Sequence, residues 1–238
     1  MKTIRQLVTI LVILACAIPA AASRLETVKV ESESMHKQID VSVVLPDSYG
    51  ARPLPVVYLL HGYGDNNLCG YLSYTNVRQY ADMFDVVLVI PDGGTNWYFD
   101  SPVDPTIRYE TFVSSELVKY IDKNYLTDAR RERRAVTGLS MGGHGALYLA
   151  IRHQDVFGAA GSMSGGVDFR PFPEKWDIKL RLGDQKTHRE NWDKNTVMAQ
   201  LPLLKDGALQ LIIDCGTEDF FFDVNVKLHE ALTKQGIH

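Results

Sequence analysis

Cysteine is scarce in this chain, and its three cysteines are not arranged to bind a metal. There is no Cys-x-x-Cys pair and no grouping of histidine with cysteine, which are the patterns of a structural zinc site. Cys69 and Cys215 lie beyond the N-terminal segment described below. Export would permit a disulfide between them, but Cys215 ends an apolar run and Cys69 follows a loop, so two separate thiols fit equally well.

Positive charge is also in short supply. The chain carries 25 lysines and arginines against 29 acidic residues, a net charge of -4. Removal of an N-terminal segment containing Lys2 and Arg5 would lower the net charge by two more units. The densest basic stretch, residues 130–134, is interrupted by Glu132, and we interpret it as a solvated turn before a strand. We therefore expect no nucleic-acid partner and no binding to an anionic membrane surface.

Long hydrophobic runs are missing too, apart from one apolar segment at the N-terminus. It covers Leu7–Ile18, follows two positive residues and precedes Ala20-Ala21-Ala22. This order is typical of a secretory signal peptide, and the run is too short to span a membrane. We predict that residues 1–22 are a signal peptide and that the mature protein, beginning near Ser23, is periplasmic or secreted. Cys16 leaves a lipoprotein open, although the leucine two positions before it is bulky for a lipidation site.

The remaining chain, residues 23–238, has the patterns of one α/β domain. Two early segments alternate between apolar and polar residues, as in an antiparallel hairpin. Later apolar runs are nearly continuous, which is typical of parallel strands covered by helices on both faces. An irregular excursion over the functional face is expected at 168–195. The expected strands are 27–31, 39–43, 56–60, 86–90 and 209–213, and the expected helices are 110–123, 143–152 and 225–235.

The sequence Gly138-Leu139-Ser140-Met141-Gly142 matches the G-x-S-x-G pattern of a nucleophile elbow. It follows an apolar strand and opens a helix of small residues, which is the context that this pattern requires. The sharp turn holds the serine in a strained backbone conformation and projects its hydroxyl from the sheet. The N-terminus of the following helix points to where negative charge develops. We therefore predict that Ser140 is a catalytic nucleophile.

A second glycine-rich segment, His61-Gly62-Tyr63-Gly64, directly follows the 56–60 strand. Acyl transfer needs N–H donors aimed at the oxyanion of the tetrahedral intermediate. In such sites one donor comes from the residue after the nucleophile and one from the loop after the third strand. The expected donors are the backbone N–H groups of Met141 and Tyr63, and the glycines allow this loop to approach a substrate closely.

Four segments together resemble the putative-esterase family: residues 140–147, His61-Gly62, Tyr109-Glu110-Thr111 and residues 214–220. The resemblance extends over most of the chain from about Val28. The family includes S-formylglutathione hydrolase, tributyrin esterases, feruloyl and acetylxylan esterases, and mycolyltransferases. Membership implies an α/β-hydrolase fold, a Ser-Asp-His triad and neither a cofactor nor a metal.

The resemblance places the acidic member of the triad after the 209–213 strand. The acid that precedes the aromatic residue at 220 is Asp219. It is preferred over Asp214, which still belongs to the strand pattern. Its role would be to hold the catalytic histidine in the correct tautomer and to stabilise the imidazolium.

The histidine should follow the acid, and only His229 and His238 do so. In the family, this stretch continues into a further strand and a loop that bears the histidine. We therefore expect the catalytic histidine beyond residue 238, and the last strand and helix of the domain to be missing from this chain. His144 lies one helical turn from the elbow, and we expect it and His61 to be structural.

The function that follows is a serine carboxylesterase that works through an acyl-enzyme. Its substrate would be a small-molecule or polysaccharide-linked ester outside the cell. Trp97 and Tyr98, after the 86–90 strand, either line the acyl or leaving-group pocket or pack in the core. The alternatives are an acyltransferase, with a sugar hydroxyl in place of water, and a non-catalytic carbohydrate-binding relative. The acyl chain, the alcohol and the oligomeric state stay open.

Overall fold

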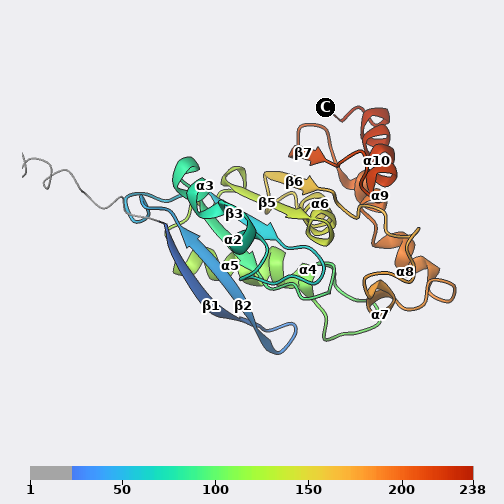
Figure 1. Cartoon of the computed structure of the whole chain (residues 1–238), viewed down its shortest axis with the longest axis horizontal. Helices are drawn as coiled ribbons and strands as arrows, with labels where there is room; N and C mark the ends of the chain where they lie inside the picture. The colour runs from blue at the N-terminus through green and yellow to red at the C-terminus, as the bar shows by residue number, and fades with distance from the viewer. Residues whose placement is uncertain (1–22, 238) are drawn as a thin grey trace, which may run out of the picture.

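The computed structural model describes residues 23–237 (Figure 1). The expected signal peptide lies outside the described residues. The strands of the described part form one sheet in the order β1-β2-β4-β3-β5-β6-β7. Their bounds are β1 Arg24–Ser32, β2 Lys37–Leu45, β3 Val56–Leu60, β4 Val87–Pro91, β5 Arg134–Leu139, β6 Ala159–Met163 and β7 Gln210–Asp214.

The pairing of these strands confirms a mostly parallel sheet with antiparallel strands at its start. β1 pairs with β2, and β2 with β4, in antiparallel orientation. The other pairs, from β4 through β3 and β5 to β6 and β7, are parallel. The strands expected at 86–90 and 209–213 each lie one residue later, as β4 and β7. β6 has no counterpart among the expected strands.

Helices connect the parallel strands, as a parallel sheet requires. The helix expected at 110–123 is a continuous helical segment that includes a π-helical turn, and the helices expected at 143–152 and 225–235 are α6 and α10. The excursion at 168–195 contains two short helices, α7 and α8. The α-helices are α2 Tyr71–Tyr74, α3 Val77–Phe84, α4 Tyr109–Thr111, α5 Val118–Asn124, α6 Met141–Arg152, α7 Ile178–Leu182, α8 Arg189–Lys194, α9 Val197–Gln200 and α10 Phe222–Lys234; the π-helical turn is Phe112–Leu117 and the 3₁₀ turns are Arg131–Arg133 and Leu201–Leu203.

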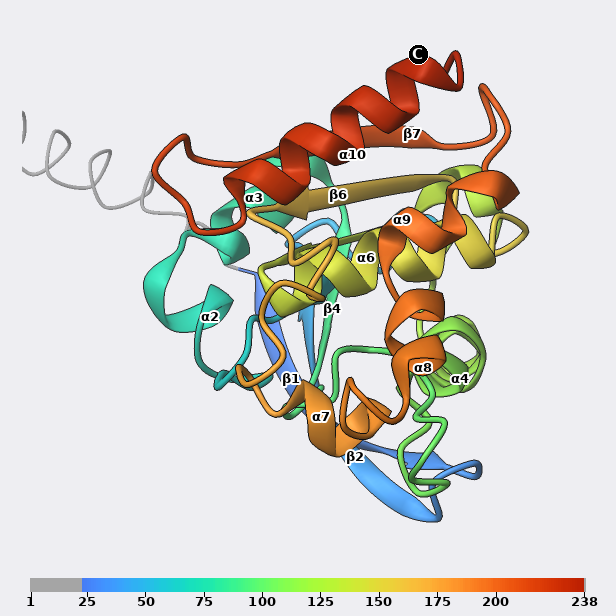
Figure 2. The ribbon, with the colours of Figure 1, turned by 90° about the vertical axis from the view of Figure 1, so that its right-hand side faces the viewer.

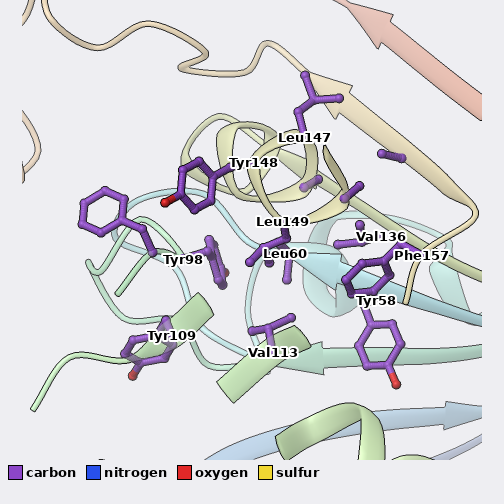
Figure 3. Packing of buried hydrophobic residues seen from close by; sticks show 14 of the residues in the cluster. Tyr58, Leu60, Tyr98, Tyr109, Val113, Val136, Leu147, Tyr148, Leu149 and Phe157 are labelled. Carbon is purple, nitrogen blue, oxygen red and sulfur yellow. The ribbon is translucent and has the colours of Figure 1, made fainter. Parts of the chain in front are cut away.

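Two hydrophobic clusters cover the two faces of the sheet. In β4, Val87 and Val89 belong to the larger cluster and Leu88 and Ile90 to the smaller one, as the period of two in a strand requires. The larger cluster, part of which Figure 3 shows around Tyr58, is covered by α6. Figure 2 shows α9 and α10 on the same side of the sheet as α6. The smaller cluster is covered by α3.

The basic stretch at 130–134 is only partly the solvated turn expected from the sequence. It does form a 3₁₀ turn that enters β5. Arg134, however, is only 5% exposed and donates to the Asp122 carboxylate at 2.5 Å. A second bond runs from its guanidinium to the carbonyl of Val156 at 3.0 Å. This arginine therefore ties α5 to the start of β5, which carries the elbow at its other end.

Candidate active site

Ser140 joins the end of β5 to the start of α6, where the chain turns sharply. Its φ is 57° and its ψ is -112°, a region that serine rarely adopts. The turn is held from both sides, because the Ser140 N–H donates to the carbonyl of Met163 at 2.9 Å and the Ser140 carbonyl accepts from the N–H of Gly166 at 3.1 Å. The surrounding structure thus fixes the strained geometry that a nucleophile elbow requires.

Close packing explains the two glycines of the G-x-S-x-G pattern. A Cβ at Gly142 would lie 1.9 Å from the carbonyl oxygen of Leu60, at the end of β3. A Cβ at Gly138 would lie 2.4 Å from the carbonyl group of Gly142. Only glycine fits at these two positions, because α6 begins directly against β5 and β3.

The oxyanion loop, residues 61–65, lies against the elbow. A Cβ built on Gly62 would be 3.7 Å from Cβ of Ser140. The peptide that joins Gly62 to Tyr63, and that carries the Tyr63 N–H, therefore lies next to the nucleophile. Met141 is fully buried at the first position of α6, where an N–H has no acceptor within the helix. Both predicted oxyanion donors therefore come from residues close to Ser140, and both assignments stay predictions.

His61 holds the peptide that carries the Tyr63 N–H. The Gly93 N–H donates to Nε2 of His61 at 2.8 Å, so the proton of the neutral ring is on Nδ1, which donates to the Gly62 carbonyl at 2.8 Å. That carbonyl and the Tyr63 N–H belong to one planar peptide and point in opposite directions. His61 therefore orients the predicted oxyanion donor, in agreement with the structural role expected for it.

Asp219 lies half-buried in the turn after β7. One oxygen of its carboxylate accepts from the N–H of Phe221 at 2.7 Å, which fixes the side chain. Asp214 is the last residue of β7, and it is exposed. Its carbonyl accepts from the N–H of Ser164 at 2.9 Å. The position after the strand agrees with the assignment of Asp219 as the triad acid, which remains a prediction.

Within residues 23–237, no histidine ring forms a hydrogen bond with the side chain of Ser140 or Asp219; His144 contacts Ser140 only through its backbone N–H, which donates to the Ser140 carbonyl at 3.1 Å. His144 is fully buried in α6, with Nδ1 3.2 Å from the carbonyl oxygen of Trp97 and Nε2 2.9 Å from that of Asn195. Burial lowers the pKa of His144 to about 4, although the two carbonyls favour the protonated ring. Both ring nitrogens are occupied, so His144 is a core residue, as expected.

Trp97 and Tyr98 are both buried, which agrees with the core-packing alternative; a substrate-pocket role for them stays a prediction. Trp97 is 1% exposed and Tyr98 is fully buried. The Tyr98 ring packs so closely on Gly145 of α6 that a Cβ there would lie 2.6 Å from it. The Tyr98 hydroxyl donates to the carbonyl of His61 at 3.3 Å. Both side chains thus match the core-packing alternative, and Tyr98 also supports the oxyanion loop through its bond to His61.

The excursion brings two other residues to the site, Trp176 and Asp177. Asp177 accepts a hydrogen bond from the Tyr63 hydroxyl at 2.7 Å. Trp176 stacks on Phe220, next to Asp219, with ring centroids 5.4 Å apart. One tip of the excursion therefore contacts both the oxyanion loop and the loop with the candidate acid. The excursion thus lies over this face, as expected. The aromatic residues of 168–195 were the signal for Trp176, whereas no local pattern marks Asp177.

The described residues offer no candidate metal centre. Between residues 23 and 237, no three histidine, cysteine or acidic side chains gather in a group that could hold a metal ion. Cys69 and Cys215 are separate thiols, the first exposed and the second half-buried. None of the helices in the same range is long and apolar enough to cross a membrane.

The strained serine between β5 and α6, the glycine-rich loop after β3 and the strand order together define an α/β-hydrolase. The chain belongs to the family described as Putative esterase, whose sequence profile matches residues 32–236. That match extends over nearly all of the described chain and confirms the resemblance carried by the elbow and the oxyanion loop.

Similar proteins are esterases and acyltransferases. An esterase of Mycobacterium tuberculosis is 36% identical over 135 residues, which are 55% of this chain and only 30% of that protein. A diacylglycerol acyltransferase/mycolyltransferase, Ag85B, of Mycobacterium leprae is 27% identical over 248 residues, covering 90% of this chain and 74% of the relative. The solved structure of a ferulic acid esterase superposes with a TM-score of 0.78 at 27% identity, covering 91% of this chain and 88% of the other.

Proposed function

We propose that this protein is a serine carboxylesterase with Ser140 as its nucleophile. The observation that carries the proposal is the strained backbone at Ser140, where φ is 57°. Strain of this kind persists only where the surrounding structure enforces it, and it clusters at active sites. A non-catalytic carbohydrate-binding relative would have no need of a strained serine. Membership in the esterase family points to the same chemistry.

In the proposed mechanism, Oγ of Ser140 attacks the ester carbonyl while a histidine takes its proton. The N–H groups of Tyr63 and Met141 stabilise the oxyanion. The histidine then protonates the alcohol oxygen, the ester bond breaks and an acyl-enzyme remains. Water, deprotonated by the same histidine, attacks the acyl-enzyme and releases the carboxylic acid. Asp219 holds the histidine in the required tautomer.

The base of this scheme is proposed to be a histidine outside residues 23–237. Part of the support is that the rings of three described histidines are engaged elsewhere. His61 and His144 have both ring nitrogens engaged with the backbone. His153 contacts the Glu110 carboxylate at 2.8 Å, at the far end of α6 from the elbow.

The substrate is proposed to be a small-molecule or polysaccharide-linked ester outside the cytoplasm. The support is the pattern of a signal peptide in residues 1–22 together with the similarity to a ferulic acid esterase. Secretion can be checked by N-terminal sequencing of the protein recovered from its native compartment, where a mature start near Ser23 is expected.

The test of the function is Ser140→Ala. We expect it to lower kcat for p-nitrophenyl esters by several orders of magnitude and to abolish covalent labelling by a fluorophosphonate, with the fold intact by circular dichroism. Ser48→Ala, which changes an exposed serine in a turn, is the matched control and should retain activity and labelling. Labelling of the Ser140→Ala protein at wild-type level would remove Ser140 from the mechanism.

An acyltransferase is the second candidate, because the relative from Mycobacterium leprae covers 90% of this chain. Such an enzyme would pass the acyl group from Ser140 to a sugar hydroxyl instead of water. Product analysis by mass spectrometry, with and without a sugar acceptor, separates the two candidates. The hydrolase predicts free acid as the main product in both cases.

A further inference from the structure

A cavity of about 200 Å³ opens beside the elbow, on the side of β3. Its walls include Gly62 of the oxyanion loop and Leu139, the residue directly before the nucleophile. A Cβ on Gly62 would lie within 3.7 Å of Cβ of Ser140, which places the cavity next to the reacting group. The other walls come from the loop before α2, from α2 itself and from its C-cap: Asp65, Gly70, Tyr71, Tyr74 and Thr75.

The surface of this cavity is mostly apolar. Leu139, which lines the cavity, is 46% exposed, and this is unusual for a residue at the end of a central strand. The Tyr71 hydroxyl donates to the carbonyl of Leu60 at 3.2 Å, so its polar end is occupied by the backbone. Tyr74, 84% exposed, forms the outer wall. Exposed apolar walls beside a nucleophile are suited to a hydrophobic part of a substrate.

The strand order decides which part of the ester this cavity can take. β3 and β7 lie on opposite sides of β5, so the cavity and Asp219 flank Ser140 from opposite sides. The histidine that Asp219 orients must protonate the departing alcohol oxygen, which therefore leaves on the β7 side. The acyl group then extends towards β3.

We propose that this cavity is the acyl-binding pocket and that Tyr74 and Thr75 set the length of the acyl chain. The proposal rests on the function proposed above. At roughly 30 Å³ for each water-sized unit, about 200 Å³ accommodates some six or seven non-hydrogen atoms. The pocket therefore favours short unbranched acyl groups, up to about hexanoyl, over long fatty acyl chains.

The test is a series of p-nitrophenyl esters from acetate to decanoate, compared by kcat/KM. For the wild-type protein we expect kcat/KM to rise by about fourfold for each methylene that the pocket buries and then to fall beyond hexanoate. Tyr74→Ala removes the outer wall and should shift the optimum by two or more carbons towards longer chains. Thr75→Phe narrows the pocket and should shift it towards acetate. Both positions are exposed, so both variants should fold.

Tyr80→Ala is the matched control, because Tyr80 is a half-exposed tyrosine on α3 outside the cavity, and it should leave the optimum unchanged. A second series keeps the acyl group as acetyl and varies the alcohol. If the Tyr74 and Thr75 variants change selectivity in that series and not in the first, the cavity binds the leaving group and the proposal is wrong. An unchanged optimum in both variants also overturns it. Neither outcome touches the role of Ser140, which the fluorophosphonate experiment tests separately.

Discussion

The backbone at Ser140 is held in a conformation that costs about 1–3 kcal/mol, and its neighbours leave no room for relaxation. The carbonyl of Leu60 would be 1.9 Å from a Cβ at position 142. An alanine there would separate α6 from β3 and move the nucleophile relative to the oxyanion loop. A displacement of about 1 Å is enough to cost roughly 10²-fold in rate, which explains why such small residues surround the elbow.

Single substitutions can decide whether Asp219 or Asp214 is the triad acid. Asp219→Asn should lower kcat by about 10⁴-fold, because the histidine would be held in the wrong tautomer. The melting temperature should not change, since the amide oxygen of asparagine can still accept from the Phe221 N–H. Asp214→Asn, in an exposed position of β7, is the matched control and should stay active. If the two variants exchange these profiles, the acid is Asp214.

The role of a residue could be predicted from the sequence where its surroundings are formed by residues adjacent to it in the chain. Ser140 is such a case, because the glycines that allow its turn lie two positions away on each side. The environments of Trp97 and Tyr98 depend on distant residues. Tyr98 is buried because Gly145 leaves room for its ring, and that contact appears only once α6 has packed against the loop after β4.

At the scale of elements, the tip of the excursion links the two loops of the site. Trp176 and Asp177 both have a φ of 52°, which is uncommon for residues other than glycine. These conformations present the carboxylate of Asp177 to the Tyr63 hydroxyl and the ring of Trp176 to Phe220. The hydrogen bond to Asp177 also raises the pKa of Tyr63, so the hydroxyl stays protonated as a donor. Mobility of this tip would therefore change the oxyanion loop and the acid loop together.

The Tyr63–Asp177 bond should couple the excursion to catalysis. Tyr63→Phe and Asp177→Ala should each lower kcat/KM by roughly threefold to tenfold, while the double variant should lose little more than either single one. Because both side chains are near the surface, the melting temperature should be unchanged. The measurement is a double-mutant cycle on kcat/KM with one ester. Effects that simply multiply would show that the two residues act independently.

Helices and strands with a clear hydrophobic pattern could be predicted from the sequence. Strand β6 shows why other elements could not. Its sequence is Ala-Ala-Gly-Ser-Met, which has little intrinsic preference for a strand. It is a strand because it pairs with β5 and β7 on its two sides. The strands approach so closely that a Cβ at Gly161 would lie 2.4 Å from the Thr137 hydroxyl. The small residues are the result of tertiary packing, which a local pattern does not reveal.

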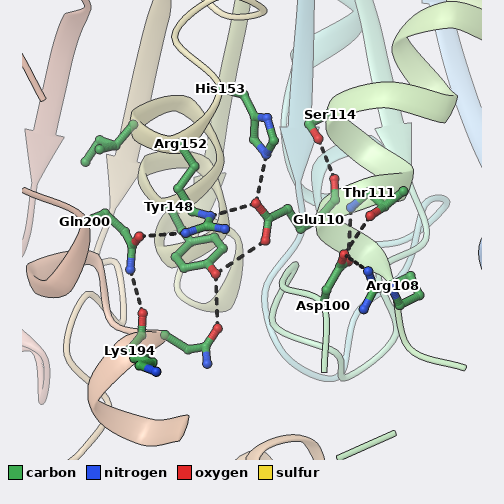
Figure 4. A network of polar contacts seen from close by, with 12 residues as sticks. Asp100, Arg108, Glu110, Thr111, Ser114, Tyr148, Arg152, His153, Lys194 and Gln200 are labelled. Carbon is green, nitrogen blue, oxygen red and sulfur yellow. Dashed lines mark hydrogen bonds and ion pairs between the residues drawn. The ribbon is translucent and has the colours of Figure 1, made fainter. Parts of the chain in front are cut away.

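At the scale of the whole molecule, Glu110 connects parts of the chain that are distant in sequence (Figure 4). Its carboxylate accepts from Nε of Arg152 at 2.7 Å and contacts Nε2 of His153 at 2.8 Å, at the C-terminal end of α6. Arg152 also donates to Gln200 of α9 at 3.0 Å. The network thus fastens α4 and α9 to α6, the helix whose other end carries the elbow.

This network should make the stability of the protein sensitive to acid. Burial alone would raise the pKa of Glu110, but the hydrogen bonds from His153 and Arg152 outweigh it, so the pKa lies below its usual value of 4.5. A carboxyl group with a lowered pKa in the folded state stabilises the fold above its unfolded pKa. That contribution is lost as the pH falls through the folded pKa, so the loss is expected below about pH 4.5.

Glu110→Gln keeps the shape of the side chain but removes its charge and leaves Arg152 without its anion. We expect it to lower the free energy of unfolding by about 2 kcal/mol at neutral pH, measured by urea denaturation. The difference from the wild-type protein should narrow when the pH is lowered well below 4.5, because protonation of the carboxyl then favours the unfolded state of the wild-type protein. Glu190→Gln, which removes the acid of an exposed pair with Lys194, should have little effect at either pH. A difference for Glu110→Gln that stays the same at both pH values would mean that shape, and not charge, holds the network together.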